Sequence, residues 1–195
     1  IAAIDHYVSR AAHKLLAALD AFPVEVAGRA ALDVGASTGG FTQVLLERGA
    51  ATVIALDVGH EQLAPFVRDD ERVIVVEGVN ARYLTRESLR AAAPGTALPD
   101  LVVADLSFIS LGLVLPALVE TVGRDADFVV LVKPQFEAGR EDVGPGGIVR
   151  DPAIHARVVE AVADAARRVG LTALAVEPSP ITGAEGNREV LMLLA

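Results

Sequence analysis

The sequence predicts an α/β protein with a doubly wound, mostly parallel seven-stranded sheet, in which one edge strand is antiparallel. Short apolar runs, of the length of buried strands, alternate along the chain with helical patterns. A glycine-rich turn follows the first of these runs and opens a helix, as in open α/β sheets that bind a ligand beside such a turn. The last two runs have no helix between them, so we expect them to form a hairpin that reverses one strand.

The first helix is expected from Ser9 to about Phe22, with Ser9 as its N-cap. Its apolar face is formed by Ala12, Leu15, Leu16 and Leu19. Buried strands are expected at Ala30–Val34, Thr52–Leu56, Arg72–Val76, Leu101–Ala104, Phe128–Val132, Leu171–Val176 and Glu189–Leu194. The helices that separate the first six are expected at Phe41–Arg48, Glu61–Arg68, Arg86–Ala93, Leu113–Val122 and Pro152–Val169.

One long irregular segment remains, from Pro134 to Asp151. Segments of this kind in compact domains are usually functional lids or disordered, and we favour a lid. The chain starts abruptly at Ile1, without an initiator methionine. We therefore expect residues 1–8 to be a linker that follows a further domain, and residues 9–195 to form a single domain.

The composition excludes several classes of site. The chain has 195 residues, of which 52% are hydrophobic, enough for one well-buried core. The absence of cysteine excludes disulfides and thiolates, and the scattered histidines form no zinc pattern, so no metal site is expected. No apolar stretch reaches the roughly 18 residues of a membrane span, so we expect a soluble, cytoplasmic protein. The net charge of −9 argues against broad non-specific nucleic-acid binding by this chain alone.

Lysine is rare in this chain and marks two positions. Among 17 basic residues, only Lys14 and Lys133 are lysines. A lysine amine, unlike an arginine, can lose its proton near neutral pH when its surroundings favour the neutral form. Lys133 ends one apolar run and Asp105 ends another, so both should lie at the ends of buried strands, where an active site is expected. The alternative is that the two lysines are a compositional accident on solvated faces.

The glycine-rich turn is expected to bind a cofactor. It reads Asp33-Val34-Gly35-Ala36-Ser37-Thr38-Gly39-Gly40-Phe41. Ser37 replaces the middle glycine of a dinucleotide fingerprint, and Asp33 adds negative charge that a diphosphate would repel. Asp33 suits instead the ammonium and sulfonium of S-adenosylmethionine. Asp57 after the next strand is placed for ribose hydroxyls, and Asn80 for adenine. The alternative is that these glycines only pack the helix against the strand.

Several absences narrow the methyl acceptor to an oxygen. Carbon-5 methylation of pyrimidines needs a cysteine, and the turn Asp105-Leu106-Ser107-Phe108 lacks the prolines typical of enzymes that methylate base amino groups. Two tyrosines and no tryptophan make a thin base-stacking platform. A hydroxyl must lose its proton before it attacks a sulfonium methyl, and the neutral amine of Lys133 is the candidate base. Positioning of the hydroxyl in line with the methyl is expected to supply most of the acceleration.

Five segments carry a family resemblance that covers essentially the whole chain. They are Tyr7-Val8-Ser9-Arg10-Ala11-Ala12-His13-Lys14-Leu15, the turn from Asp33 to Thr42, Val103-Ala104-Asp105-Leu106-Ser107-Phe108-Ile109-Ser110, Leu131-Val132-Lys133-Pro134-Gln135-Phe136-Glu137 and Gly186-Asn187-Arg188-Glu189. In this order they resemble the TlyA family of FtsJ-like rRNA 2′-O-methyltransferases, also called hemolysin A-like proteins.

The resemblance implies a Rossmann-like class I methyltransferase that uses S-adenosyl-L-methionine and a catalytic tetrad. The tetrad maps to Lys14, Asp105, Lys133 and Glu189. Cofactor contacts are expected from the turn residues Asp33, Gly35, Ala36, Ser37, Thr38, Gly39, Gly40 and Phe41, and from Asp57, Val58, Asn80, Ala81, Asp105 and Leu106. Family members methylate the ribose of cytidines in rRNA, so the expected partner is rRNA within ribosomal subunits. They usually carry a small N-terminal RNA-binding domain joined by a short linker, and we expect residues 1–8 to belong to that linker.

Several other side chains have two interpretations. The cations Arg82, Arg86 and Arg90 either contact phosphates or form a solvated helix face, which we favour. Arg140 and Arg150 flank Gly144-Pro145-Gly146-Gly147 and either clamp RNA or do not. Phe108 either lines the methyl pocket or belongs to the core. We expect His6, His13 and Glu185 to be solvated bystanders.

Three other functions remain as alternatives. The first is a membrane-active hemolysin, although the sequence shows no cationic amphipathic helix and no stable membrane association is expected. The second is a cofactor-binding RNA assembly factor whose catalysis has lapsed. The third is a small-molecule O-methyltransferase. The sequence leaves the oligomeric state open.

Overall fold

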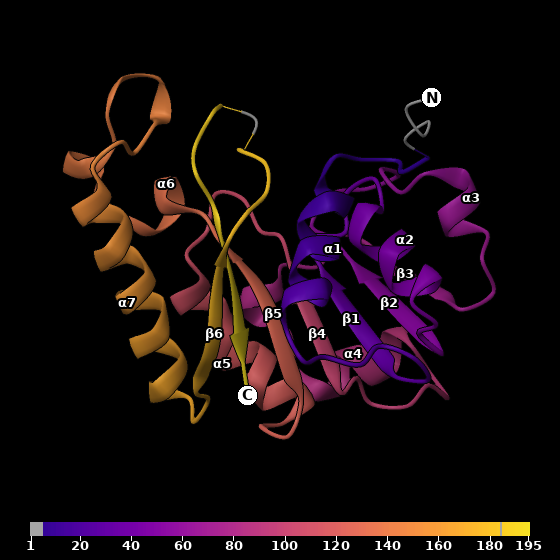
Figure 1. Ribbon diagram of the computed structural model, residues 1–195. Helices are drawn as coiled ribbons and strands as arrows, with labels where there is room; N and C mark the ends of the chain where they lie inside the picture. Colours follow the sequence, from indigo (N-terminus) through magenta and orange to yellow (C-terminus); the bar gives the residue numbers. More distant parts are fainter. Residues whose placement is uncertain (1–5, 184) are drawn as a thin grey trace.

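A twisted seven-stranded sheet with helices on both faces forms the centre of the molecule (Figure 1). The structure is a computed structural model that describes residues 6–183 and 185–195. The strands are β1 (Ala30–Val34), β2 (Thr52–Leu56), β3 (Val73–Val76), β4 (Leu101–Ala104), β5 (Asp127–Val132), β6 (Ala173–Pro178) and β7 (Val190–Leu194). The helices are α1 (Ala11–Ala21), α2 (Gly40–Glu47), α3 (Pro65–Arg68), α4 (Arg86–Ala92), α5 (Leu111–Val122), α6 (Pro134–Glu137) and α7 (Pro152–Arg168).

The strand order is β3-β2-β1-β4-β5-β7-β6. The pairs from β3 to β5 are all parallel, whereas β7 runs antiparallel to both β5 and β6. The predicted doubly wound, mostly parallel sheet and the β6–β7 hairpin are therefore confirmed. The hairpin inserts its reversed strand, β7, one place inside the edge, so that β6 forms the edge. The chain changes direction across the sheet between β1 and β4, and ligands of such sheets bind outside the carboxyl ends at that point.

Both faces of the inner strands β1, β2, β4 and β5 are buried, which explains why these strands are continuous apolar runs rather than alternating ones. Successive residues of β1 point to opposite sides: Leu32 packs with α4, α5 and α7, while Ala31 packs with α1 and α2. Phe128 of β5 is fully buried on the same side as Leu32, in the core formed with α4, α5 and α7. This rigid double-sided packing fixes the strand ends, and hence the turns that follow them.

Four helices differ from the sequence prediction at their N-terminal ends, and the smallest difference is in α2, which begins at Gly40 rather than at Phe41. The helix expected from Glu61 begins only at Pro65, because Glu61 has a left-handed φ of +54° and proline is best tolerated in the first helical turn. The helix expected from Leu113 begins at Leu111, because the Ser110 hydroxyl accepts a hydrogen bond from the Gly112 backbone N–H. Ser9 lies one residue before the N-cap of α1, and its hydroxyl accepts from Ala11 N instead.

The segment from Pro134 to Asp151 is less irregular than expected. It contains α6 and two 3₁₀ turns, at Arg140–Asp142 and Pro145–Gly147. The buried Asn187 side chain ties it to the β6–β7 connection, since Val149 N donates to Asn187 Oδ1 and Asn187 Nδ2 donates to Gly147 O, both at 2.9 Å. Its function as a lid stays a prediction. A third 3₁₀ turn, Ala81–Tyr83, was not predicted.

Of the linker expected at residues 1–8, residues 1–5 lie outside the described part. Residues 6–8 lie against α2: His6 Nε2 and Tyr7 Oη contact the Glu47 carboxylate, and Val8 N donates to Gln43 Oε1. Within residues 6–183 and 185–195, no helix has both the length and the apolar character to cross a membrane.

Candidate active site

The candidate site lies above the carboxyl ends of β1, β2, β4 and β5. A cavity of about 480 Å³ opens there, between the segments that follow β1, β2, β3 and β4. Its walls include these expected cofactor-binding residues: Gly35, Ser37, Asp57, Val58, Asn80, Ala81, Asp105 and Leu106. A second cavity of about 220 Å³ is lined by Gly35, Ala36, Ser37, Thr38, Gly40, Phe41, Asp105 and Lys133, among others. The two cavities share Gly35, Ser37, Asp105 and Ser107, so the cofactor candidate site adjoins the Lys133 amine.

The turn after β1 is held open by backbone hydrogen bonds to the neighbouring strand. Gly35 N and Ala36 N both donate to Leu56 O of β2, and Ser37 N donates to Asp57 Oδ2 at 2.7 Å. The other Asp57 oxygen accepts from Gly59 N at 2.7 Å. These bonds fix the Asp57 carboxylate at the cavity wall, where it retains lone pairs for the hydroxyls of a ligand. Asn80 caps the following 3₁₀ turn through its Oδ1, which leaves its amide N–H groups as donors.

Gly35 permits a backbone contact that no other residue would allow. Its φ is +85°, and a Cβ at this position would lie 2.5 Å from the Asp105 carbonyl oxygen. The turn after β1 and the turn after β4 therefore touch through backbone alone. We expect Gly35→Ala to push Asp105 away and to abolish measurable cofactor binding, with a loss of about 1–3 kcal/mol in the free energy of unfolding from backbone strain.

The matched control for this substitution is Gly95→Ala. Gly95 has a similar φ of +78°, but a Cβ there would meet no atom within 4 Å. The two variants should therefore share the cost of backbone strain and differ in cofactor binding, measured by isothermal titration calorimetry. Equal cofactor affinity in the two variants would mean that the contact between Gly35 and Asp105 does not shape the site.

Two expected cofactor residues are absent from the walls of both cavities among the described residues. Gly39 is the N-cap of α2 with a φ of +100°, and its missing side chain makes room for Leu63 and Val67. Asp33 is fully buried beneath the turn. Thr42 Oγ1 donates to Asp33 Oδ2 at 2.7 Å, while Oδ1 has no hydrogen-bond partner in the described part of the chain. Burial raises the pKa of the Asp33 carboxyl to about 7, opposed by the hydrogen bond from Thr42.

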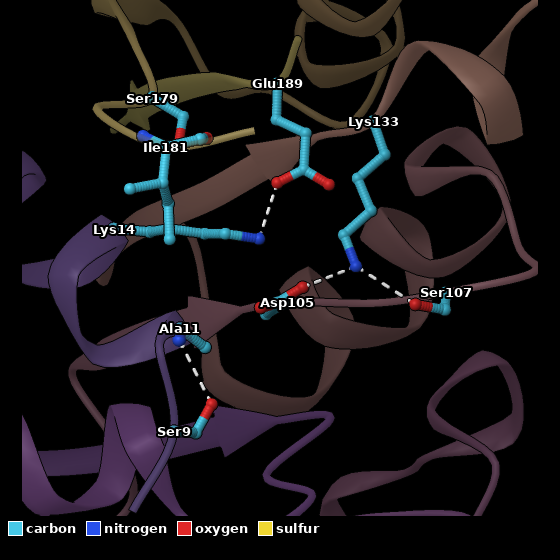
Figure 2. Close-up of polar contacts among 9 residues, drawn as sticks. All are labelled: Ser9, Ala11, Lys14, Asp105, Ser107, Lys133, Ser179, Ile181 and Glu189. Atoms are coloured by element: carbon cyan, nitrogen blue, oxygen red, sulfur yellow. Dashed lines mark hydrogen bonds and ion pairs between the residues drawn. The ribbon is translucent and has the colours of Figure 1, made fainter. Parts of the chain in front are cut away.

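The four tetrad candidates form two buried ion pairs (Figure 2). Lys133 Nζ lies 2.6 Å from Asp105 Oδ1, and Lys14 Nζ lies 2.5 Å from Glu189 Oε2. In Figure 2 the Glu189 carboxylate lies between the two amines, with one oxygen paired to Lys14 and the other facing toward Lys133. The structure thus brings together, from four distant segments, the residues that the family resemblance implies, and their catalytic role stays a prediction.

Each pair is nearly neutral as a unit, which is the condition for burying charge. Lys14, Lys133 and Glu189 are each less than one-tenth exposed. Removal of one member of a buried pair leaves an uncompensated charge and commonly costs about 3–5 kcal/mol. Of the four residues, Asp105 and Lys133 line the smaller cavity, and their catalytic role stays a prediction.

The sequence did not predict the contact between Lys133 and Ser107, and it left two interpretations of Phe108. Lys133 Nζ donates to Ser107 Oγ at 3.0 Å, so the turn after β4 supplies two partners to the same amine. Ser107 lies two residues after Asp105, and that spacing was the only signal for it in the sequence. Phe108 is not part of the core: it is 89% exposed, lines the larger cavity, and has a left-handed φ of +64°.

The remaining polar candidates lie outside the tetrad. Arg86 Nε donates to the Thr121 carbonyl, so this cation is used inside the fold rather than presented to phosphates. Arg140 and Arg150 are exposed, as is Glu185. His6 is exposed and pairs with Glu47 at 2.8 Å, and the His13 ring packs edge-on against Tyr7.

Comparison with known proteins gives consistent matches. The family model described as FtsJ-like methyltransferase matches residues 7–195. The 16S/23S rRNA (cytidine-2′-O)-methyltransferase TlyA of Mycobacterium tuberculosis is 57% identical over 188 residues, which cover 96% of this chain and 68% of that protein. Hemolysin A of Brachyspira hyodysenteriae is 40% identical over 185 residues, which cover 95% of this chain and 75% of that protein.

A solved structure agrees with the sequence matches. The crystal structure of a candidate hemolysin from Lactococcus lactis superposes with a TM-score of 0.90 at 46% identity, covering 96% of this chain and 88% of that one. The range matched by the family model, residues 7–195, includes both ion pairs and the turn after β1. On sequence, fold and extent of similarity, this chain belongs to the FtsJ-like methyltransferases, in the TlyA family.

Proposed function

We propose that this chain is an rRNA methyltransferase that uses S-adenosylmethionine to methylate the ribose 2′-hydroxyl of cytidine. The observation that carries the proposal is the position of Lys133 and its partner Asp105 at the junction of the two cavities. The relative from Mycobacterium tuberculosis is an rRNA (cytidine-2′-O)-methyltransferase by name, which supports the choice of acceptor.

The residues around the larger cavity fit S-adenosylmethionine. Asp57 offers carboxylate oxygens to ribose hydroxyls, and Asn80 offers amide donors to adenine. Asp33 holds a buried oxygen without a hydrogen-bond partner in the described chain, beneath the turn that would face the methionine part. A negative charge there favours a ligand with an ammonium and a sulfonium group. When bound, this cofactor supplies an electrophilic methyl group.

The side chains of the tetrad would prepare the acceptor hydroxyl. In the proposed step Lys133 first releases to solvent the proton that it holds in the ion pair with Asp105. Its neutral amine then accepts the proton of the 2′-hydroxyl, and the oxygen thereby becomes nucleophilic. Asp105 and Ser107 hold the amine from one side, so it has a fixed direction toward the cavity. Glu189, held by Lys14, lies across from it and stabilises the protonated amine that results. Water is kept from the pair by burial, which strengthens these interactions.

The proposal is tested by transfer of labelled methyl groups from S-adenosylmethionine to unmodified ribosomal subunits. We expect label on ribose 2′-oxygens of cytidine in rRNA and none on free cytidine, because positioning by the particle supplies most of the acceleration. Label on free nucleosides or small hydroxyl compounds, with none on subunits, would assign a small-molecule acceptor. Cofactor binding without any transfer would favour a lapsed enzyme, and leakage of liposomes without transfer would favour the hemolysin function.

A further inference from the structure

Two polar side chains outside the tetrad, one half-buried and one fully buried, tie together the segments that carry it. Glu137, at the end of α6, contacts the turn after β4, and Asn187, just before β7, contacts the segment after α6. We propose that Glu137 and Asn187 are positioning residues, each of which holds one of the two ion pairs in place. The proposal deepens the proposed function, on which its kinetic part rests.

Glu137 closes a ring of contacts that contains the Lys133–Asp105 pair. Its carboxylate accepts from Ser110 Oγ at 2.6 Å and from Leu111 N at 2.7 Å. Asp105 and Ser110 belong to the turn after β4, and Lys133 and Glu137 belong to the turn after β5, which includes the short helix α6. The two turns are thus joined at both ends, by the ion pair and by the Glu137 carboxylate. The Glu137 contacts therefore limit how far the two turns can separate at the ion pair.

The Glu137 carboxylate does more than cap a helix. Ser110 already caps α5, because its hydroxyl accepts from Gly112 N at 3.1 Å. The Glu137 carboxylate accepts a hydrogen bond from the Ser110 hydroxyl, which orients a Ser110 lone pair toward Gly112. It also accepts from Leu111 N, the first N–H of the helix. Burial raises the pKa of the Glu137 carboxyl, and these two hydrogen bonds oppose the shift. A half-buried carboxylate that depends on donors from the other turn is sensitive to any separation of the two turns.

Asn187 plays the matching part for the Lys14–Glu189 pair. Its side chain is fully buried and bonds to both Gly147 O and Val149 N, some forty residues earlier in the chain. Its own carbonyl accepts from Gly183 N at 2.9 Å. The turn that results closes around the neighbouring carboxylate, because a Cβ on Gly183 would lie 2.5 Å from Glu189 Oε1. Asn187 therefore fixes both the turn and the Glu189 side chain within it.

The two lysines of the chain provide a direct readout of both pairs. A protein labelled with carbon-13 at the lysine ε-position gives two side-chain NMR signals, which Lys14→Arg and Lys133→Arg assign. We expect Glu137→Ala to shift the Lys133 signal and leave the Lys14 signal in place. We expect Asn187→Ala to do the reverse. Glu137→Gln keeps acceptors for Leu111 N and should give a spectrum close to that of the wild type.

Kinetics add a second readout. We expect Glu137→Ala and Asn187→Ala to lower kcat by about 10²-fold, as misplacement of a reacting group by about 1 Å can do, with KM for S-adenosylmethionine little changed. If wild-type protein transfers no methyl group to ribosomal subunits, the proposed function fails, but the NMR result still decides the positioning roles. Should either alanine variant not fold, two milder variants are measured in the same way. Ser110→Ala removes the hydrogen bond to Glu137 together with the one from Gly112 N, and Asn187→Asp removes the one to Gly147 O.

Thr121→Ala is the control for general destabilisation. Thr121 is fully buried and donates to Ala117 O, and it lies about 15 Å along α5 from Leu111. This variant should lose stability without shifting either lysine signal. The positioning roles are wrong if the folded Glu137 and Asn187 variants leave both signals unchanged. They are also wrong if each variant shifts both signals alike, because that pattern indicates a general loosening of the fold.

Discussion

Replacement of Lys133 with alanine should lower the rate of methyl transfer by about 10²–10⁴-fold, the usual contribution of a general base. The larger cavity does not include Lys133 in its walls, so the dissociation constant of S-adenosylmethionine should stay within a few fold of the wild-type value. Single-turnover transfer to ribosomal subunits measures the first quantity, and calorimetry measures the second. A rate within tenfold of the wild type would contradict the role of Lys133 as base.

Lys133→Arg separates the role of base from the role of cation. Arginine keeps a positive charge beside Asp105 but does not lose its proton in proteins, so it cannot accept one from a hydroxyl. We expect this variant to be nearly as slow as the alanine variant and more stable, since the buried carboxylate keeps a partner. Recovery of most of the wild-type rate with arginine would show that Lys133 acts through its charge.

The sheet could be predicted from the sequence because its two signals are local. A buried parallel strand is a short apolar run, and the bounds expected for β1, β2 and β4 agree with the structure at both ends. The edge strand β6 was expected two residues too early, at Leu171, because an edge strand is only half covered and its pattern is weaker. The position of β7 between β5 and β6 depends on pairing across the sheet, which no local pattern encodes.

The candidate site was predictable in its members but not in its pairing. Charged residues at the ends of apolar runs identified Lys133 and Asp105, and the family resemblance added Lys14 and Glu189. Which carboxylate contacts which amine depends on atoms from segments up to 175 residues apart. No separate role was predicted for Ser107, Glu137 and Asn187, which lie within the family segments. A hydrogen bond to a distant part of the chain leaves no spacing pattern in a sequence.

Replacement of Asp33 with asparagine should remove a pH-dependent loss of stability from the cofactor-free protein. The pKa of the buried carboxyl is about 7, against a usual value of 3.8. The folded state therefore holds a proton that the unfolded state releases between pH 4 and 7, so the wild type loses stability as the pH rises through that range and stays at the lower level above it. Three pH units correspond to about 4 kcal/mol. Asparagine does not ionise, so the difference in the free energy of unfolding between variant and wild type should grow by that amount.

The same substitution, Asp33→Asn, should stabilise the empty protein and weaken cofactor binding. Measuring both tests whether the buried charge of Asp33 serves the cofactor. A cationic ligand above the turn favours the ionised carboxylate, so S-adenosylmethionine should bind the wild type more tightly at pH 8 than at pH 6 and bind the asparagine variant equally at both. Thr42→Val is the matched control, because it keeps the Asp33 carboxyl and removes the hydrogen bond that lowers its pKa, so the pH dependence of binding should persist and move to higher pH. A variant that binds the cofactor as the wild type does at both pH values would mean that the buried charge has no role in the site. Tighter binding at high pH in the wild type alone would identify Asp33 as a buried charge that destabilises the empty protein and is compensated when a cation binds.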